Sequence, residues 1–434
     1  MNIQTVQFAH ILENRDLEAL HDFLSQTAFV ISHKNESIET ILKVLWYLPA
    51  NSTIIIVSNC AQEEQDELVR ALKTHMADHR QTYFIHQKDA EIARLFQEAG
   101  VATILGADGK VINGKGEGMY IGALGAYQLG YPRWLVFYDA DNFVPSALLE
   151  YTLAMCRLFM AASHRDYDPL TGQSTLRASD LHNVRICWSS KPDLDNRDWS
   201  ARILGRTTRV VSPLFESLVE GWFGIYNHPI RSSNAGEQGM TVKTAASLRF
   251  SSGFSVETFQ LLDLLFNATE QRARPEETIF QQYLSQSPHF HEKKDDEHIK
   301  KMIEESLGCF FHFEAALPDT VKEQLLRVYA ELQLERIIPT VYPSLQDLHL
   351  EQFSSLMQRY ALFADANIQE MPIADLDYQD LLPVIVKRQE LLTEMAYQTA
   401  LGDTSHLQEM RETETSYQNL LTNETGFQNF LVND

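Results

Sequence analysis

The 434-residue chain is poor in cysteine, and the cysteines it has lie far apart. They are Cys60, Cys156, Cys187 and Cys309. No two of them form a Cys-x-x-Cys pair, which excludes a zinc ribbon and a thioredoxin-type redox centre. Free, buried thiols in a reducing compartment are the simplest interpretation, so a cytoplasmic location is expected.

Long apolar runs and an excess of positive charge are also absent. No stretch of about 18 apolar residues occurs, and the first residues, MNIQTVQFAHILENRD, lack the basic segment and apolar core of a signal peptide, so we expect no membrane association and no export. Lys and Arg number 36 against 59 Asp and Glu, a formal charge of −23. So acidic a chain is not expected to bind nucleic acid, which requires clustered positive charge. A local basic pocket for a small anionic substrate remains compatible with this charge.

Short apolar runs alternate with helical patterns through the first half of the chain. This order predicts an α/β fold with a parallel sheet and helices on both faces, and ligands of such sheets bind beyond the carboxyl ends of the strands. The predicted strands are residues 28–32, 53–58, 82–85, 134–138, 184–189 and 247–250. The predicted helices are residues 37–48, 63–80, 90–99 and 116–129, and residues 193–209 are expected to form a loop and a short helix.

The pattern changes after about residue 318, where long helices are predicted. They cover residues 320–336, 344–364, 378–398 and 404–421. A chain of 434 residues exceeds the usual size of a single core, so a second unit is expected. We expect these helices to form a packing or oligomerisation subdomain, through which the chain could form a homodimer.

The segment WLVFYDADNFVP, residues 134–145, is the most informative motif. An apolar, aromatic run ends in Asp139 and Asp141, separated only by Ala140. Residues i and i+2 of an extended segment point to the same side, so the two carboxylates would converge at the end of a strand. Like charges this close repel unless a cation lies between them, and carboxylate oxygens suit Mg²⁺ or Mn²⁺, which often hold substrate phosphates. The alternative is an ordinary junction between a strand and a turn.

Two loops before this motif also carry polar groups. FVISHKNES, residues 29–37, places Lys34, Asn35 and Glu36 after the first strand, where a nucleotide-binding fold meets base and ribose. A polar loop with a helix cap is the alternative. NGKGEGM, residues 113–119, combines glycines, which let a backbone approach a ligand, with the mobile charge of Lys115. It opens a helix whose amides favour an anion, and a flexible turn is the alternative.

Three later segments could hold further ligand groups. ARILGRTTRVVS, residues 201–212, has arginines and hydroxyls that match a phosphate or carboxylate. NAGEQGMT, residues 234–241, has small and polar residues suited to a polyhydroxylated ligand. His289 and His291 of SPHFHEKK could complete a metal site with the aspartates. The plainer alternatives are an exposed loop with paired arginines, a helix start and surface histidines.

The order of these motifs resembles that of the mannosyl-3-phosphoglycerate synthases, a family of retaining GT-A glycosyltransferases. The shared elements are KNE, GKGEGM, DADN, GR.T, NAGE, SGF.VE and PH.HE, over residues 29–298. The resemblance implies a Rossmann-like GT-A domain over residues 1–318, with a mixed, mostly parallel sheet. Its nucleotide-binding half would cover residues 25–145 and its acceptor-binding half residues 146–318, followed by a helical subdomain over residues 319–434.

The resemblance also implies an activity. Mannose would pass from GDP-mannose to the 2-hydroxyl of 3-phosphoglycerate with retention of configuration, giving a precursor of the compatible solute mannosylglycerate. A divalent metal would assist, with Mg²⁺ expected first and Mn²⁺ or Co²⁺ as alternatives.

Residue roles follow from the same resemblance. The donor would contact Lys34, Asn35, Glu36, Lys88, Gly114, Lys115, Gly116, Glu117, Asp139 and Ala140. The acceptor would contact Gly205, Arg206, Thr208, Asn234, Ala235 and Thr241. Asp139, Asp141 and Glu237 would form the catalytic centre, with Asp141 and either His289 or His291 on the metal. Glu237 would act as a nucleophile or orient the sugar.

Two positions depart from the family's usual pattern. Ser32 stands where Pro is usual, and Gln238-Gly239 stands where His-Ala is common, which leaves donor specificity open. A glucosyl-3-phosphoglycerate synthase is therefore the first alternative, since those enzymes share the Gly-Lys-Gly, Asp-x-Asp and Gly-Arg-x-Thr elements. A non-catalytic nucleotide-sugar-binding protein is disfavoured by the intact lysine and aspartates. A nucleotidyltransferase is disfavoured because SHKNES replaces its glycine-rich loop.

Overall fold

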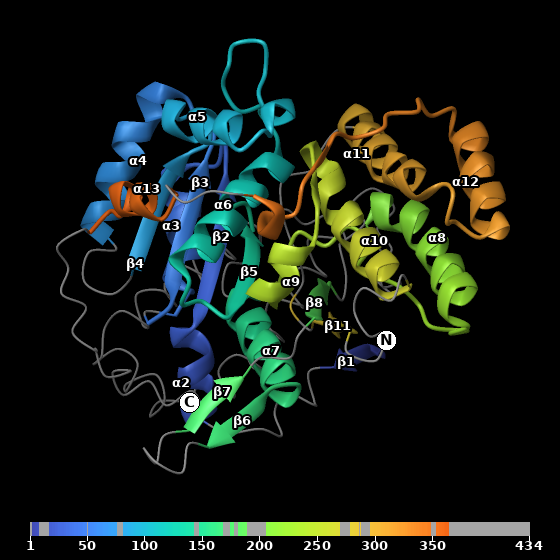
Figure 1. The fold of residues 1–434 in the computed structure, drawn as a ribbon, viewed down its shortest axis with the longest axis horizontal. Coiled ribbons are helices and arrows are strands. Elements are labelled where there is room, and N and C mark those ends of the chain that lie inside the picture. The colour runs from blue at the N-terminus through green and yellow to red at the C-terminus, as the bar shows by residue number, and fades with distance from the viewer. Residues whose placement is uncertain are drawn as a thin grey trace, which may run out of the picture.

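An eight-stranded sheet forms the centre of the protein (Figure 1). The computed structural model describes residues 2–7, 17–49, 51–75, 81–142, 147–167, 174–177, 181–188, 205–269, 278–285, 287, 296–348 and 353–363. In spatial order the strands are β1 (Asn2–Gln7), β11 (Thr278–Leu284), β8 (Leu181–Cys187), β9 (Gln238–Thr241), β5 (Trp134–Asp139), β2 (Thr27–His33), β3 (Thr53–Ser58) and β4 (Gln81–His86). Neighbours pair in parallel except at β9, which runs antiparallel to β5 and β8. The expected mixed, mostly parallel α/β sheet is confirmed.

Helices cover both faces of the sheet. One face packs against α2 (Leu17–Ser25), α3 (Ile38–Trp46), α4 (Gln62–His75) and α7 (Ala147–Ala161). The other packs against α5 (Ala90–Glu98), α6 (Lys115–Leu129), α8 (Arg206–Phe223), α9 (Val242–Ser247), α10 (Val256–Thr269), α11 (Asp296–Gly308), α12 (Asp319–Leu332) and α13 (Phe353–Tyr360). Short strands add a hairpin of β6 (His164–Tyr167) with β7 (Ser174–Arg177), and a pair of β10 (Phe250–Ser251) with β12 (Val341–Tyr342).

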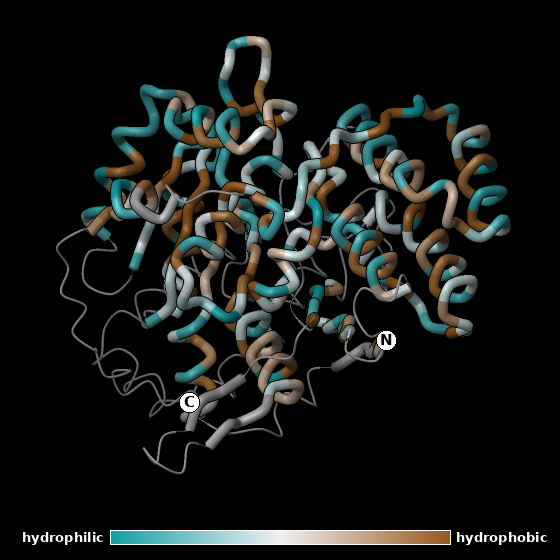
Figure 2. Tube along the Cα trace, in the orientation of Figure 1, coloured by the Kyte–Doolittle hydropathy of each residue, from teal (hydrophilic) through white to brown (hydrophobic). Residues whose placement is uncertain are grey.

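The central strands are apolar on both faces, as a sheet covered on both sides requires. In β2, Ala28 and Val30 belong to one hydrophobic cluster, whereas Phe29 and Ile31 belong to the other. All four side chains are fully buried. Figure 2 shows hydrophobic residues along these strands and hydrophilic ones on the outer helices. Two buried faces explain why these strands read as unbroken apolar runs in the sequence.

Three helices of the first half, α3, α5 and α6, begin and end within two residues of their predicted bounds, whereas the end predicted for α4 at residue 80 lies outside the described residues. The Ser37 hydroxyl accepts the amide of Thr40 at 3.2 Å at the start of α3. The Asp89 carboxylate accepts the amide of Glu91 at 2.8 Å at the start of α5. Gly130, with φ of 76°, ends α6 in the left-handed conformation that glycine adopts without strain.

Two predicted elements after residue 240 are wrong. The strand predicted over residues 247–250 is reduced to Phe250, which begins β10, because Ser247 still belongs to helix α9. That helix begins where the Thr241 hydroxyl accepts the amide of Thr244 at 3.1 Å. The single helix predicted over residues 344–364 is broken, since a 3-10 turn, Leu345–Asp347, leads into extended Leu348 before α13. The helices predicted over residues 378–398 and 404–421 lie outside the described residues.

The described residues after position 318 share the core of the sheet. Val321, Leu325, Tyr342 and Met357 belong to the same cluster as α6 and the central strands. The amide of Leu362 donates to the carbonyl of Thr82 in β4 at 2.9 Å. This segment therefore returns across the α6 face to the far edge of the sheet, and the boundary expected at residue 318 stays a prediction.

Among the described residues, no helix has the length and apolar character needed to cross a bilayer.

Candidate functional site

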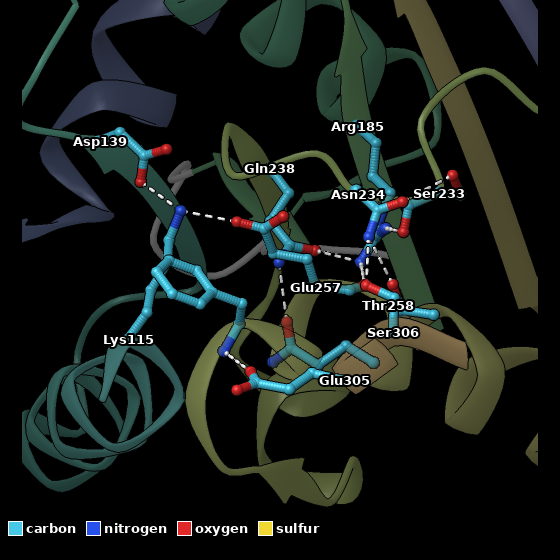
Figure 3. Close-up of polar contacts among 12 residues, drawn as sticks. Lys115, Asp139, Arg185, Ser233, Asn234, Gln238, Glu257, Thr258, Glu305 and Ser306 are labelled. Carbon is cyan, nitrogen blue, oxygen red and sulfur yellow. Dashed lines mark hydrogen bonds and ion pairs between the residues drawn. The ribbon is translucent and has the colours of Figure 1, made fainter. Parts of the chain in front are cut away.

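Three sequence motifs meet at the carboxyl end of β5. Lys115, the first residue of α6, places its Nζ 2.6 Å from Oδ1 of Asp139, the last residue of β5. The same Nζ lies 2.6 Å from Oε1 of Glu257, in the first turn of α10. Figure 3 shows the lysine pointing between the two carboxylates. The glycine-lysine loop and the Asp-x-Asp motif are thus joined directly, and Glu257 of the segment SGFSVE completes the group.

Burial makes this charged group strongly interdependent. The side chains of Lys115 and Asp139 are 16% and 24% exposed, and that of Glu257 is 5% exposed. Burial opposes the charge on Lys115, but Asp139 and Glu257 more than offset it, and the pKa of Lys115 lies well above its usual value. The lysine therefore stays protonated across the physiological pH range. Burial raises the pKa of Glu257, an effect that Lys115 opposes.

The backbone of Gly236 closes over this pair. A Cβ at this position would overlap Oδ2 of Asp139 and would lie 2.8 Å from Nζ of Lys115. Only glycine fits, so the segment NAGE is packed directly on the lysine and the aspartate. Glu237 follows as a fully buried residue, and its carbonyl accepts the amide of Ile186 at 3.0 Å. Burial and the nearby charge of Asp139 raise the pKa of Glu237 well above its usual value.

A fully buried arginine, Arg185 of β8, lies behind the site. Its guanidinium donates to the carbonyl of Ser232 at 2.9 Å, to Oε1 of Gln238 at 3.0 Å and to the carbonyl of Glu257 at 2.5 Å. Burial lowers its pKa to about 10, so it remains charged at neutral pH. It fixes the segments that carry Glu237 and Glu257 relative to each other.

The sequence prediction missed both Arg185 and Glu257. A signal existed for Arg185, since an arginine inside the strand LHNVRIC interrupts a buried run. A charge in such a strand needs several partners, which it finds here. Glu257 belongs to the SGF.VE element, for which the sequence suggested no role, and the ion pair with Lys115 spans 142 residues.

The predicted acceptor residue Asn234 uses its side chain inside the protein. Its amide group donates to Thr258 Oγ1 at 2.7 Å and to Ser306 Oγ at 2.8 Å (Figure 3). Its carbonyl oxygen accepts from Ser233 Oγ at 3.0 Å, and Ser233 Oγ lies 2.9 Å from Ser212 Oγ in α8. Asn234 therefore links the NAGE segment to α8, α10 and α11, and its observed role is structural.

Thr241 lies at the wrong end of the sheet for the predicted acceptor contact. It pairs with Trp134, the first residue of β5, whereas Asp139 is the last. Five residues of strand separate the two ends, about 16 Å at the usual rise per residue. Its buried hydroxyl caps α9. Ala235 is also buried, but it precedes Gly236 and so lies beside the site.

The glycines of the GKGEGM loop approach protein rather than open space. A Cβ on Gly114 would overlap the Glu117 carboxylate, and a Cβ on Gly116 would overlap the carbonyl of Ser251. On the side where a Cβ would lie, these two glycines make room for protein, and their contact with the donor stays a prediction. They let the start of α6 pack against the β10 segment. Gly118 is less crowded, since a Cβ there would lie at an ordinary contact distance of 3.5 Å from Gln87 Oε1.

Glu117 also departs from its predicted donor contact, because its side chain is fully buried. The Tyr342 hydroxyl donates to its Oε1 at 2.6 Å, and the amide of Gly253 donates to its Oε2 at 3.2 Å. Burial raises the pKa of Glu117, while these hydrogen bonds lower it in part. Its carboxylate is thus held by protein groups.

The loop after β2 carries its polar residues at the carboxyl end of the strands, where Asp139 also lies. Lys34 and Asn35 are exposed, and the backbone amide of Lys34 donates to Oε2 of Glu36 at 2.7 Å. Beneath them, His33 Nδ1 lies 2.9 Å from Ser58 Oγ, and His33 Nε2 lies 3.0 Å from the carbonyl of Glu36. The loop is therefore held from below, while its first two side chains are available to a ligand.

The turn after β4 lies at this end too. The backbone amide of Lys88 donates to Nδ1 of His86 at 3.2 Å. Buried Gln87 donates to the carbonyl of Ile112 at 2.6 Å and to that of Gly114 at 3.2 Å. This ties the β4 turn to the loop before Lys115. Predicted donor residues from three separate loops thus lie at the carboxyl end of the parallel strands.

The predicted acceptor-phosphate residues lie at the start of α8. Gly205 occupies the N-cap position, and Thr208 is buried in the first turn. The guanidinium of Arg206 lies 2.6 Å from Oδ1 of Asp296, the first residue of α11. The Asp296 side chain is 98% exposed. A helix N-terminus with an adjacent arginine is a suitable site for a phosphate.

The residues at the end of β5 fit a divalent metal that binds together with a phosphate-bearing substrate. No group of three or more His, Cys, Asp or Glu side chains with metal-ligand geometry exists among the described residues. His289 and His291 lie outside them. Asp141 is partly exposed and follows Asp139 by two residues, with buried Ala140 between them. Mg²⁺ typically uses one or two carboxylates together with substrate phosphates and water, which matches this donor set.

Comparison with known proteins adds a family match. The family model described as mannosyl-3-phosphoglycerate synthase matches residues 3–357. A relative of that name from Pyrococcus furiosus is 30% identical over 320 residues, covering 71% of this chain and 77% of the relative. One from Aeropyrum pernix is 30% identical over 323 residues, covering 72% and 78%. A crystal structure of glucosyl-3-phosphoglycerate synthase from Mycobacterium tuberculosis with phosphoglyceric acid aligns at a TM-score of 0.43 and 12% identity, covering 80% and 98%.

Proposed function

Because the chain belongs to the mannosyl-3-phosphoglycerate synthase family, we propose that it transfers mannose from GDP-mannose to the 2-hydroxyl of 3-phosphoglycerate, with retention at the anomeric carbon. The observation that carries this proposal is the convergence of Lys115, Asp139 and the Gly236–Glu237 segment. Three motifs typical of the family meet there, at the sheet edge where α/β folds bind ligands.

The donor would lie along this edge. Lys34, Asn35 and Lys88 would contact the nucleotide, since they belong to the loops after β2 and β4. Lys115 fixes the Asp139 carboxylate and neutralises part of its charge, which lowers the repulsion that a diphosphate would meet there. Asp141 and the diphosphate would hold the divalent metal, which supplies positive charge against the departing GDP.

The acceptor phosphate would bind at the start of α8. Arg206 is held there by Asp296, an exposed partner, and exposed ion pairs are weak. A phosphate that carries more charge can therefore take the place of the aspartate. With its phosphate bound by Arg206 and the hydroxyl of Thr208, the acceptor would direct its 2-hydroxyl toward the end of β5.

Retention is best explained by attack on the same face from which GDP leaves. The bond between the mannose C1 and the diphosphate oxygen breaks while the bond between C1 and the acceptor 2-oxygen forms. The hydroxyl proton passes to the departing diphosphate oxygen, so charge and atoms balance. Glu237 would orient the site rather than attack C1, since its side chain is fully buried.

The test is a turnover assay with purified protein, GDP-mannose and 3-phosphoglycerate. We expect equal amounts of GDP and mannosyl-3-phosphoglycerate, with an α-anomeric carbon signal by NMR. Parallel reactions with UDP-glucose and GDP-glucose address the alternative sugar. Faster turnover of either glucose donor would contradict the proposed donor. Light scattering on the same sample tests the proposed homodimer, which requires twice the chain mass of 49.7 kDa.

A further inference from the structure

A buried hydrogen bond joins the segment after α12 to the first turn of α6. The Tyr342 hydroxyl donates to Oε1 of Glu117 at 2.6 Å, and both side chains are fully buried. The other carboxylate oxygen of Glu117 accepts the amide of Gly253 at 3.2 Å. A buried carboxylate is stable in such a place only if it keeps these donors.

The segment that carries Tyr342 is itself firmly anchored. The amide of Ser252 donates to the carbonyl of Thr340 at 2.9 Å, and the amide of Thr340 donates to Ser252 Oγ at 3.1 Å. The Tyr120 hydroxyl, from the second turn of α6, donates to the carbonyl of Pro343 at 2.9 Å. The rings of Tyr120 and Tyr342 stack with centroids 5.6 Å apart. Tyr342 is therefore a fixed point against which Glu117 can be held.

Glu117 lies two residues after Lys115 in the same helical turn. The hydrogen bonds that hold the Glu117 side chain therefore also restrict the backbone that carries Lys115. Lys115 must reach both Asp139 and Glu257 at 2.6 Å, so a small displacement of this turn would break at least one contact. Gly114 leaves room for the Glu117 carboxylate, and Gly116 lets this turn pack against the carbonyl of Ser251 in β10.

We propose that Glu117 and Tyr342 are positioning residues for Lys115, so that the segment after α12 is a working part of the donor site. The inference rests on the proposed function for the identity of the donor. It assigns the glutamate of GKGEGM a role through the lysine rather than through contact with the nucleotide. It also explains why the chain returns to the α6 face after α12.

The test compares two tyrosine variants of the full chain. Tyr342→Phe removes the hydroxyl that holds Glu117, and Tyr120→Phe removes a hydroxyl that bonds the same segment without touching Glu117. We expect Tyr342→Phe to lower kcat/KM for GDP-mannose by about tenfold, because a misplacement near 1 Å is costly at a catalytic centre. The KM for 3-phosphoglycerate should stay unchanged. In Tyr120→Phe the two hydrogen bonds between Ser252 and Thr340 still anchor the segment, so either quantity should change by less than about twofold.

Glu117→Gln provides an independent arm. Glutamine has one acceptor oxygen for the two donors that hold Glu117, the Tyr342 hydroxyl and the Gly253 amide, so the side chain is held less firmly. The variant should show the same donor-specific loss, and the double variant with Tyr342→Phe should be no worse than the more impaired single variant, because both changes weaken the hold on one side chain. Equal effects of the two tyrosine variants, or equal changes in donor and acceptor KM, would overturn the inference. If Tyr342→Phe fails to fold, Glu117→Gln against Tyr120→Phe makes the same comparison.

A failure of the proposed function gives a different result. Wild-type protein would then not turn over GDP-mannose at all. Calorimetry with GDP on the same variants still tests the positioning role, since weaker binding in Tyr342→Phe but not in Tyr120→Phe supports it. Identical GDP affinities of the wild-type protein and Tyr342→Phe refute it.

Discussion

Replacing Arg185 with methionine should strongly destabilise the protein. The arginine is fully buried, and methionine has a similar length without hydrogen-bond donors. The substitution removes the charged donor from three acceptors, namely the carbonyls of Ser232 and Glu257 and the amide oxygen of Gln238. Only longer bonds remain on two of them, from the amide of Ala235 to Ser232 at 3.3 Å and from the side chain of Asn183 to Gln238 at 3.4 Å. Each of them is enclosed by protein, so water cannot replace the guanidinium without local opening.

The magnitude follows from those three acceptors. A hydrogen bond from a charged donor contributes about 1.5–3 kcal/mol, and the longer bonds that remain offset part of the loss, so losing three of them implies about 3 kcal/mol or more. This agrees with the roughly 3–5 kcal/mol typical when one member of a buried charged network is removed. Removing the desolvated charge offsets part of the loss, which is why we expect the lower end of that range.

Urea unfolding followed by tryptophan fluorescence measures this change, since Trp134 is fully buried and reports on the sheet. Arg94→Met is the matched control. Arg94 lies on the surface with Glu91 and Glu98, so its loss should leave the unfolding midpoint essentially unchanged. If Arg185→Met costs less than about 1 kcal/mol, the hydrogen bonds drawn in Figure 3 do not hold the site together.

Asp141→Ala should abolish transfer and the response of donor binding to Mg²⁺; near wild-type turnover would contradict the metal assignment. Arg206→Ala should raise the KM for 3-phosphoglycerate far more than that for GDP-mannose, and equal increases would remove its acceptor role. Burial lowers the pKa of His182 to about 4, which Gln281 opposes. The unfolded chain therefore binds the proton first, and stability should be full above pH of about 6.5 and fall as the pH drops toward 4. His182→Gln should flatten that dependence in acid unfolding curves; an unchanged slope would refute it.

The sheet could be predicted from sequence because its central strands are apolar on both faces. Residues 53–58 and 134–138 read as strands for this reason, and both are confirmed. Strand β9 could not be predicted, since it is only four residues long and lies within a motif rich in small residues. Its antiparallel insertion between β8 and β5 decides which end of NAGEQGMT meets Asp139. Without that register, the sequence places Thr241 in the site, although it lies beside Trp134 at the opposite end of β5.

The candidate site could be predicted only where the polar residues are local. Asp139 and Lys115 follow a strand and open a helix, so their place at the sheet edge follows from topology. Glu257 pairs with this lysine across 142 residues, and no periodicity indicates such a contact. Glu117 shows a second limit of sequence prediction. The motif GKGEGM indicates that its residues belong to one site, but it does not indicate which of their side chains face a ligand.

Two cations expected to lie near substrate phosphates, Lys115 and Arg206, are already paired with carboxylates. Lys115 lies between Asp139 and Glu257, which are 24% and 5% exposed, whereas Arg206 is paired with Asp296, which is 98% exposed. A phosphate can displace the exposed aspartate at little cost, because that pair is well solvated. A phosphate cannot draw Lys115 away in the same manner, because Asp139 and Glu257 would then lose their cation. We infer that the acceptor binds by replacing Asp296, whereas the donor diphosphate must bring its own positive charge, which a divalent metal supplies.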